Sequence, residues 1–73
     1  MVFEVGKTYC PADSGFDPIK VIKRTERCIK VDNGTSEWKM VIKVDENGDE
    51  YVIDSSVPRK WRSAFVYSAK WVV

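Results

Sequence analysis

The stretch from Pro18 to Asp54, PIKVIKRTERCIKVDNGTSEWKMVIKVDENGDEYVID, decides the fold class. Apolar and polar residues alternate through much of it, which is the pattern of half-buried β-strands. Two Asn-Gly pairs, Asn33-Gly34 and Asn47-Gly48, interrupt the alternation. Two-residue type I′ hairpin turns favour Asn-Gly because both central residues need a positive φ. The stretch therefore predicts a meander of antiparallel hairpins.

Two-residue turns at these pairs also predict which side chains face the core. The first turn sets Ile29 opposite Trp38, and the second sets Val44 opposite Tyr51. A slip of one residue would turn a whole row of apolar side chains toward solvent. The side chains expected to face inward are Trp38, Met40, Ile42, Val44, Tyr51 and Ile53.

Further strands are expected on both sides of the turns. The expected strands before the tail cover residues 1–9, 19–24, 28–32, 37–45 and 50–54. Residues 10–18 are rich in Pro, Asp, Ser and Gly and are expected to form a loop. A turn at 25–27 joins two strands that share one core. The alternative is a single bent strand from residue 19 to residue 31, which would be unusually long.

The tail from residue 59 to residue 73 fits two patterns. As a strand, it alternates Phe65 and Tyr67 with Val66 and Ser68, whereas as a helix it gathers apolar residues on one face. Its content of Val, Phe, Tyr and Trp favours a strand at the end. We expect a short 3₁₀ or helical turn near residues 59–63, followed by a strand over residues 65–72.

Length and composition limit the function classes. Seventy-three residues make one domain, residues 1–73, with a small core. The net charge of +1 selects no class of partner. There is no histidine, and two cysteines alone, Cys10 and Cys28, cannot complete a zinc site. We expect reduced cysteines, no metal and no cofactor.

Several activities and locations are not expected. The carboxylates cluster at turns, where no acid and base face each other across a cleft, so we expect no enzyme and no small-molecule substrate. No apolar run approaches the roughly 20 residues of a membrane span. We therefore expect a cytoplasmic protein with no membrane partner.

Short strands joined by tight turns predict an all-β, partly open barrel of five to six strands. The segments Val5-Gly6-Lys7-Thr8-Tyr9, Val21-Ile22-Lys23-Arg24-Thr25 and Gly48-Asp49-Glu50-Tyr51 resemble those of SH3-like small barrels. They are also similar to short barrel proteins of gut Firmicutes and of their phages and mobile elements. The resemblance covers most of the chain. It transfers no catalytic or binding residue, because the fold hosts unrelated functions.

Basic residues are concentrated in two parts of the chain. Residues 18–44 carry seven basic and three acidic side chains, and the tail after Asp54 carries four basic and no acidic ones. A basic face of the sheet can follow a phosphate backbone while an aromatic ring stacks on a base. The alternative is that the lysines only solvate the outer face and that Trp61 covers the end of the barrel. The candidate residues are Lys20, Arg24, Lys30, Lys39, Lys43, Arg59, Lys60, Trp61 and Arg62.

The sequence thus favours a non-enzymatic binding module that contacts nucleic acid through a basic sheet face. The alternative is a protein-protein interaction or docking module, such as a phage or mobile-element accessory protein. That module would use a sheet edge or the aromatic C-terminal tail.

Overall fold

The computed structural model of the chain describes residues 1–13, 15–54 and 57–73, and for residues 62–64 it describes the backbone only. In these ranges it contains seven β-strands and one 3₁₀ helix. In chain order they are β1 (Thr8–Pro11), β2 (Ile19–Arg24), β3 (Cys28–Asp32), β4 (Glu37–Val41), β5 (Lys43–Val44), β6 (Glu50–Ile53), η1 (Arg59–Phe65) and β7 (Val66–Val72). The all-β prediction is confirmed, and the strand count is higher than the five or six expected.

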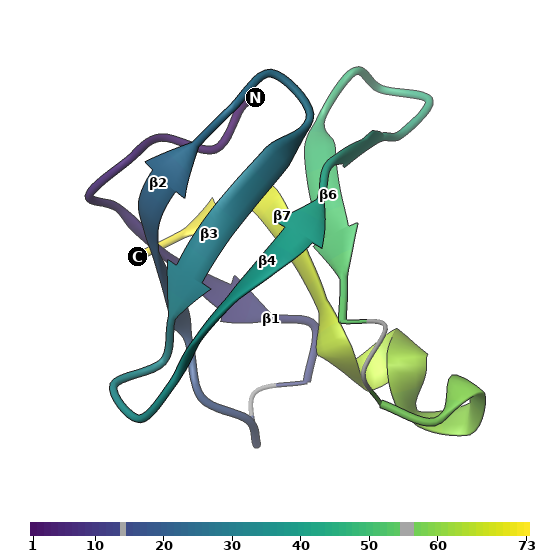
Figure 1. Ribbon diagram of the computed structural model, residues 1–73. Helices are drawn as coiled ribbons and strands as arrows, with labels where there is room; N and C mark the ends of the chain where they lie inside the picture. Colours follow the sequence, from purple (N-terminus) through teal and green to yellow (C-terminus); the bar gives the residue numbers. More distant parts are fainter. Residues whose placement is uncertain (14, 55–56) are drawn as a thin grey trace.

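The strands form one antiparallel sheet in the order β4-β3-β2-β1-β7-β6-β5. The sheet curls into a nearly closed barrel (Figure 1). β1 pairs with both β2 and β7, so the first and last strands meet as predicted. The two edges of the sheet, β4 and β5, follow each other in the chain.

The extra strand arises because the expected strand from residue 37 to residue 45 is divided at Ile42. Before Ile42, β4 pairs with β3, and the Ile42 amide still donates to the Arg27 carbonyl (2.7 Å). After Ile42, β5 pairs with β6. The chain therefore passes from one edge of the sheet to the other at this residue, which brings the barrel close to closure.

The first Asn-Gly turn is longer than the two residues expected. Asp32 pairs with Glu37, so residues 33–36 form a four-residue loop. Side-chain oxygens hold it, since Asp32 accepts from the Gly34 amide and Asn33 accepts from the amides of residues 35 and 36. Ile29 therefore lies opposite Met40 and not Trp38. A shift of two residues leaves the faces unchanged.

The second turn holds three residues between Asp45 and Asp49. The Asp45 carboxylate accepts from the amides of Asn47 (2.9 Å) and Asp49 (3.0 Å), and Gly48 has a φ of +83°. This is the three-residue hairpin loop that ends in a left-handed glycine. Val44 consequently lies opposite Glu50 rather than Tyr51.

Because the pairing is shifted by one residue, the residues of β6 that were expected to face outward face the core instead. Glu50 and Val52 are buried, whereas Tyr51 and Ile53 are only half-buried. Val44 is 62% exposed, so the expectation that it faces inward is wrong. The inward prediction is confirmed for Trp38, Met40 and Ile42, which precede Val44 in the expected strand. These three residues pack in or against the core.

A bulge at Ile22 changes the orientation of the last residues of β2. Val21 pairs with Val31, but the next pair is Lys23 with Lys30, so one residue of β2 is left without a partner in β3. The turn at residues 25–27 is confirmed and excludes a single strand from 19 to 31. The bulge turns Lys23 outward and places Arg24 opposite the buried Ile29.

The N-terminal segment does not form the expected strand over residues 1–9. Val5 and Gly6 form a turn, Gly6 has a φ of +90°, and β1 begins only at Thr8. The residues before the turn cover the end of the barrel beside the β2–β3 loop (Figure 1). Phe3 is buried there, and its ring meets that of Tyr9 edge-on with centroids 4.8 Å apart.

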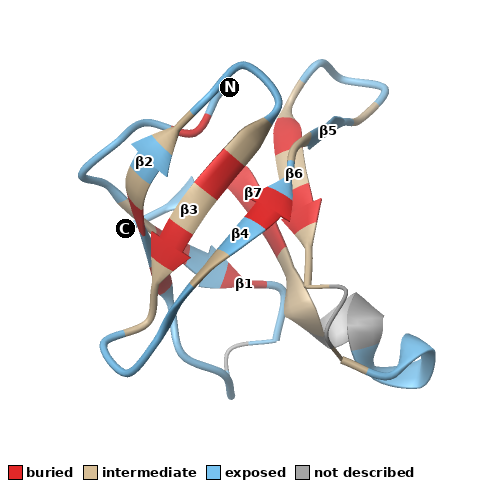
Figure 2. Ribbon diagram, in the orientation of Figure 1, coloured by how far each residue is buried: buried red, intermediate tan, exposed pale blue. Residues whose placement is uncertain are grey.

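The tail follows the mixed prediction, because η1 precedes the last strand, β7. Buried residues occur along the strands, between half-buried and exposed ones (Figure 2). The core consists of Phe3, Tyr9, Ile19, Val21, Ile29, Val31, Met40, Val52, Tyr67 and Ala69. No helix in the described ranges is long and apolar enough to cross a bilayer.

Candidate functional site

Three lysines lie side by side across the outer face of β2, β3 and β4. Lys23 pairs with Lys30, and Lys30 pairs with Lys39. Directly opposed residues of antiparallel strands have Cβ atoms about 4.5–5.5 Å apart, and like charges in these positions destabilise a sheet. We call Lys23, Lys30 and Lys39 the lysine row. The row concentrates positive charge, and the repulsion among its three ammonium groups lowers the stability of the sheet.

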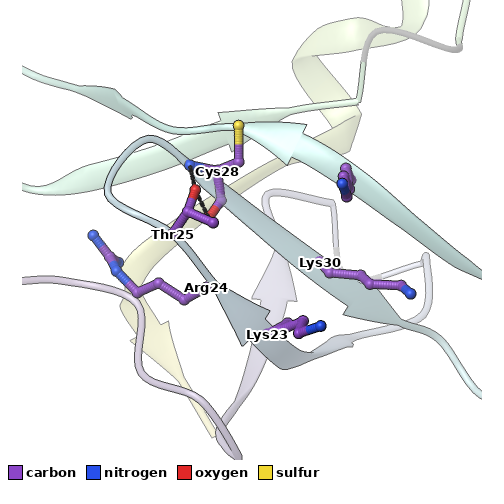
Figure 3. Close-up of a pocket in the computed structure, with 6 residues that line it drawn as sticks. Lys23, Arg24, Thr25, Cys28 and Lys30 are labelled. Carbon is purple, nitrogen blue, oxygen red and sulfur yellow. Dashed lines mark hydrogen bonds between the residues drawn. The ribbon is translucent and has the colours of Figure 1, made fainter.

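The lysine row borders a hollow of about 140 Å³. Its described lining consists of Lys23, Arg24, Thr25, Cys28, Lys30 and Lys39. Figure 3 shows the side chains of Lys23 and Lys30 extending in the same direction, whereas that of Arg24 extends away from them. The Thr25 hydroxyl closes the adjoining loop by accepting from the Cys28 amide (3.2 Å). Three ammonium groups therefore border a hollow that contains no carboxylate in its described lining, whereas the Arg24 guanidinium extends away from it.

Acidic residues compensate the lysine row only at its flank. The Lys30 ammonium lies 3.3 Å from a carboxylate oxygen of Glu37, and both side chains are well exposed. The next outward positions across the same strands are Lys20, Asp32 and Glu37, which are of mixed charge. The longer first turn places Lys39 opposite Lys30, where a two-residue turn would have placed Glu37. An exposed ion pair of this kind leaves the charge of the row largely available.

Arg24 has a different role from the one predicted. The bulge at Ile22 turns it toward the end of the barrel, where its Nη1 and Nη2 donate to the two carboxylate oxygens of Glu50 (2.6 and 2.8 Å). Its Nη1 also donates to the Phe3 carbonyl (3.0 Å), and the Phe3 amide donates to Glu50 (2.9 Å). Only 25% of the Arg24 side chain and 11% of the Glu50 side chain are exposed.

The ion pair shifts the protonation equilibria of both groups. The hydrogen bonds from Arg24 lower the pKa of Glu50, and they outweigh the opposing effect of burial. The same contact raises the pKa of Arg24. Both groups stay charged at neutral pH, and their charges are directed at each other. Arg24 therefore contributes mainly to the closure of the barrel end.

Two further predicted lysines lie on the strands around the row. Lys20 is exposed in β2, and Lys43 is exposed in β5. Neither lines the hollow of the lysine row, and Lys20 lies opposite Asp32. The structure thus brings together Lys30 and Lys39 from the predicted set and adds Lys23, which the alternation of β2 had not placed outward.

The predicted residues of the tail lie apart from the lysine row. Arg59 and Lys60 are exposed on η1, and the Lys60 ammonium lies 5.8 Å from the centre of the Trp61 ring. Trp61 is 53% exposed and lines a separate apolar hollow beside Pro58. The side chain of Arg62 lies outside the described residues. The described linings of the two hollows have no residue in common.

Cys28 is half-buried in the lining of the basic hollow, and Cys10 is exposed on β1. Both are free thiols. Among the described residues, no group of three or more Cys, Asp or Glu side chains is arranged to hold a metal ion.

Comparisons of the chain with protein-family models, with curated proteins and with solved structures found no significant match. The functional argument therefore depends on the geometry of the chain itself.

Proposed function

We propose that this protein is a non-enzymatic module that binds the phosphate backbone of single-stranded nucleic acid through the lysine row. The observation that carries the proposal is the direct cross-strand pairing of Lys23, Lys30 and Lys39. Neighbouring strands lie about 4.8 Å apart, so the row extends over about 10 Å. An anionic partner that bridges the three ammonium groups would relieve their mutual repulsion.

An extended polyanion suits this surface better than a single small anion. The three ammonium groups are spread over about 10 Å across β2, β3 and β4, which is wider than one phosphate group. No aromatic ring belongs to the described lining of the hollow, so base stacking has no platform there. Contacts with phosphates fix position but do not read bases, so we expect weak sequence preference.

We also propose that the barrel is of the SH3-like type and that the protein acts in the cytoplasm. The support for the fold type is the meander from β1 to β4, the pairing of β1 with β7, and the 3₁₀ helix before the last strand. The similarity to barrel proteins of gut Firmicutes, their phages and mobile elements stays a prediction.

The test is the affinity for a fluorescent single-stranded oligonucleotide, measured by anisotropy at several salt concentrations. Three phosphate contacts predict a slope of log K against log salt of about −2, or a roughly twentyfold loss of affinity between about 50 and 200 mM salt. We expect the Lys23→Gln/Lys30→Gln/Lys39→Gln variant to bind weakly and with a slope near zero.

A matched control removes the same charge elsewhere. The Lys43→Gln/Lys60→Gln/Lys70→Gln variant loses three exposed lysines outside the hollow and should keep most of the affinity and the slope. Equal losses in the two triple variants would show that only the net charge matters and would overturn the proposal.

A further inference from the structure

A second hollow, of about 160 Å³, has the opposite chemical character. It lies where the loop after β1, the β3–β4 hairpin and the start of β7 meet, and it is lined by Phe16, Asp17, Asn33, Trp38, Asp54, Phe65 and Tyr67. We call it the acidic pocket. No lysine or arginine belongs to its described lining, and it shares no residue with the basic hollow.

Aromatic rings form much of the wall of the acidic pocket. Phe16 and Phe65 pack together with ring centroids 4.2 Å apart. The Tyr67 hydroxyl donates to the Asp17 carbonyl (3.4 Å), which ties the loop after β1 to β7. Aromatic faces carry negative electrostatic potential and attract cations.

Carboxylates add to this negative potential. Asp17 and Asp54 lie on the wall of the acidic pocket, on segments far apart in the chain. Burial raises the pKa of the Tyr67 hydroxyl, and the charges of Asp54 and Asp17 raise it further. The field of both carboxylates therefore reaches the aromatic wall, where it favours a positively charged ligand.

We propose that the acidic pocket binds an arginine side chain of a partner protein. A cavity of about 150 Å³ can hold a benzene molecule, so 160 Å³ leaves room for a planar guanidinium. Guanidinium stacks on aromatic faces and pairs with carboxylates through parallel hydrogen bonds. The apolar hollow at Val57, Pro58 and Trp61 adjoins through Phe16 and Phe65 and offers a surface for the flanking residues of the segment.

This site is independent of the lysine row. Trp38 and Lys39 are neighbours in β4, and their side chains point to opposite faces of the strand. The chain could therefore hold a polyanion on one face of β4 and a basic protein segment on the other.

The test is a titration of the ¹⁵N-labelled protein with N-acetyl-arginine methylamide. We expect the Trp38 indole signal and the amides of Asp17 and Asp54 to shift with a dissociation constant of about 1 mM, as suits one side chain. N-acetyl-citrulline methylamide, which has nearly the same shape but no charge, should leave these signals in place.

Variants separate binding from folding. We expect Asp17→Asn to weaken binding of the arginine compound about tenfold or more while the spectrum stays dispersed, and Lys39→Gln to leave it unchanged. The absence of saturable shifts with the arginine compound, or equal binding of the citrulline compound, would overturn the proposal.

Discussion

Arg24 and Glu50 join the end of β2 to the start of β6 by two parallel hydrogen bonds of 2.6 and 2.8 Å. The pair also holds the backbone of Phe3 on both sides, at its amide and at its carbonyl. One ion pair thus links three segments distant in the sequence at the end of the barrel where the N-terminus lies.

Glu50→Gln tests this link. The substitution keeps the shape of the side chain but replaces a charged acceptor, and we expect the free energy of unfolding to fall by about 2 kcal/mol. For a domain of this size, the loss corresponds to a melting temperature lower by about 10 °C. Glu37→Gln breaks an exposed pair with Lys30 and should cost at most about 0.5 kcal/mol. Equal costs for the two variants, measured by thermal unfolding, would contradict the account.

The same pair predicts the response to acid. Because the pKa of Glu50 is lowered in the folded protein, its stabilising contribution is complete above the ordinary glutamate value of about 4.5. The contribution is lost as the pH falls through the lower folded pKa. Urea unfolding of wild type and Glu50→Gln should therefore give stabilities that differ at neutral pH and converge in acid. A difference that is constant with pH would exclude this role.

The lysine row predicts that removing one of its lysines weakens binding but raises the stability of the folded protein. Lys39→Gln removes a like charge from beside Lys30, so we expect the variant to be more stable by a few tenths of a kcal/mol at low salt. The gain should shrink as salt screens the repulsion. Lys43→Gln, at an exposed position outside the hollow, should change stability less. A loss of stability in Lys39→Gln would mean that the row stabilises the sheet and would remove one support for a binding role.

The second hairpin turn predicts that Asp45, which precedes it, stabilises the fold through its side-chain oxygen. Asp45→Ala removes the acceptor for two backbone amides and should cost about 1–2 kcal/mol. Asp45→Asn keeps an oxygen in the same place and should cost less. Chemical denaturation of both variants measures the difference, and equal losses would show that the carboxylate charge rather than the acceptor geometry matters.

The strands could be predicted from the sequence because alternation of apolar and polar residues reports directly on a half-buried sheet. The registers could not, because the side chains of Asp32, Asn33 and Asp45 bind nearby amides and lengthen both Asn-Gly turns. At the second turn, the longer loop shifts the pairing by one residue, so Glu50 and Val52 are buried in place of Tyr51 and Ile53.

The candidate site was predictable only in part, for a related reason. Strict alternation places Arg24 outward, but the bulge at Ile22 exchanges it with Lys23. The one local signal is that Val21 and Ile22 are consecutive apolar residues in an otherwise alternating strand, which a bulge accommodates. The acidic pocket had no sequence signal, because Asp17, Trp38 and Tyr67 come from separate segments that only the closed barrel brings together.

The most direct test of the central claim is an amide chemical-shift map of the ¹⁵N-labelled protein, titrated with a short single-stranded oligonucleotide at low salt. We predict shifts centred on Lys23, Cys28, Lys30 and Lys39, which reverse when salt is added. Signals at the acidic pocket should not move. Shifts confined to η1 and Trp61, or no shifts at any oligonucleotide concentration, would contradict a nucleic-acid site at the lysine row.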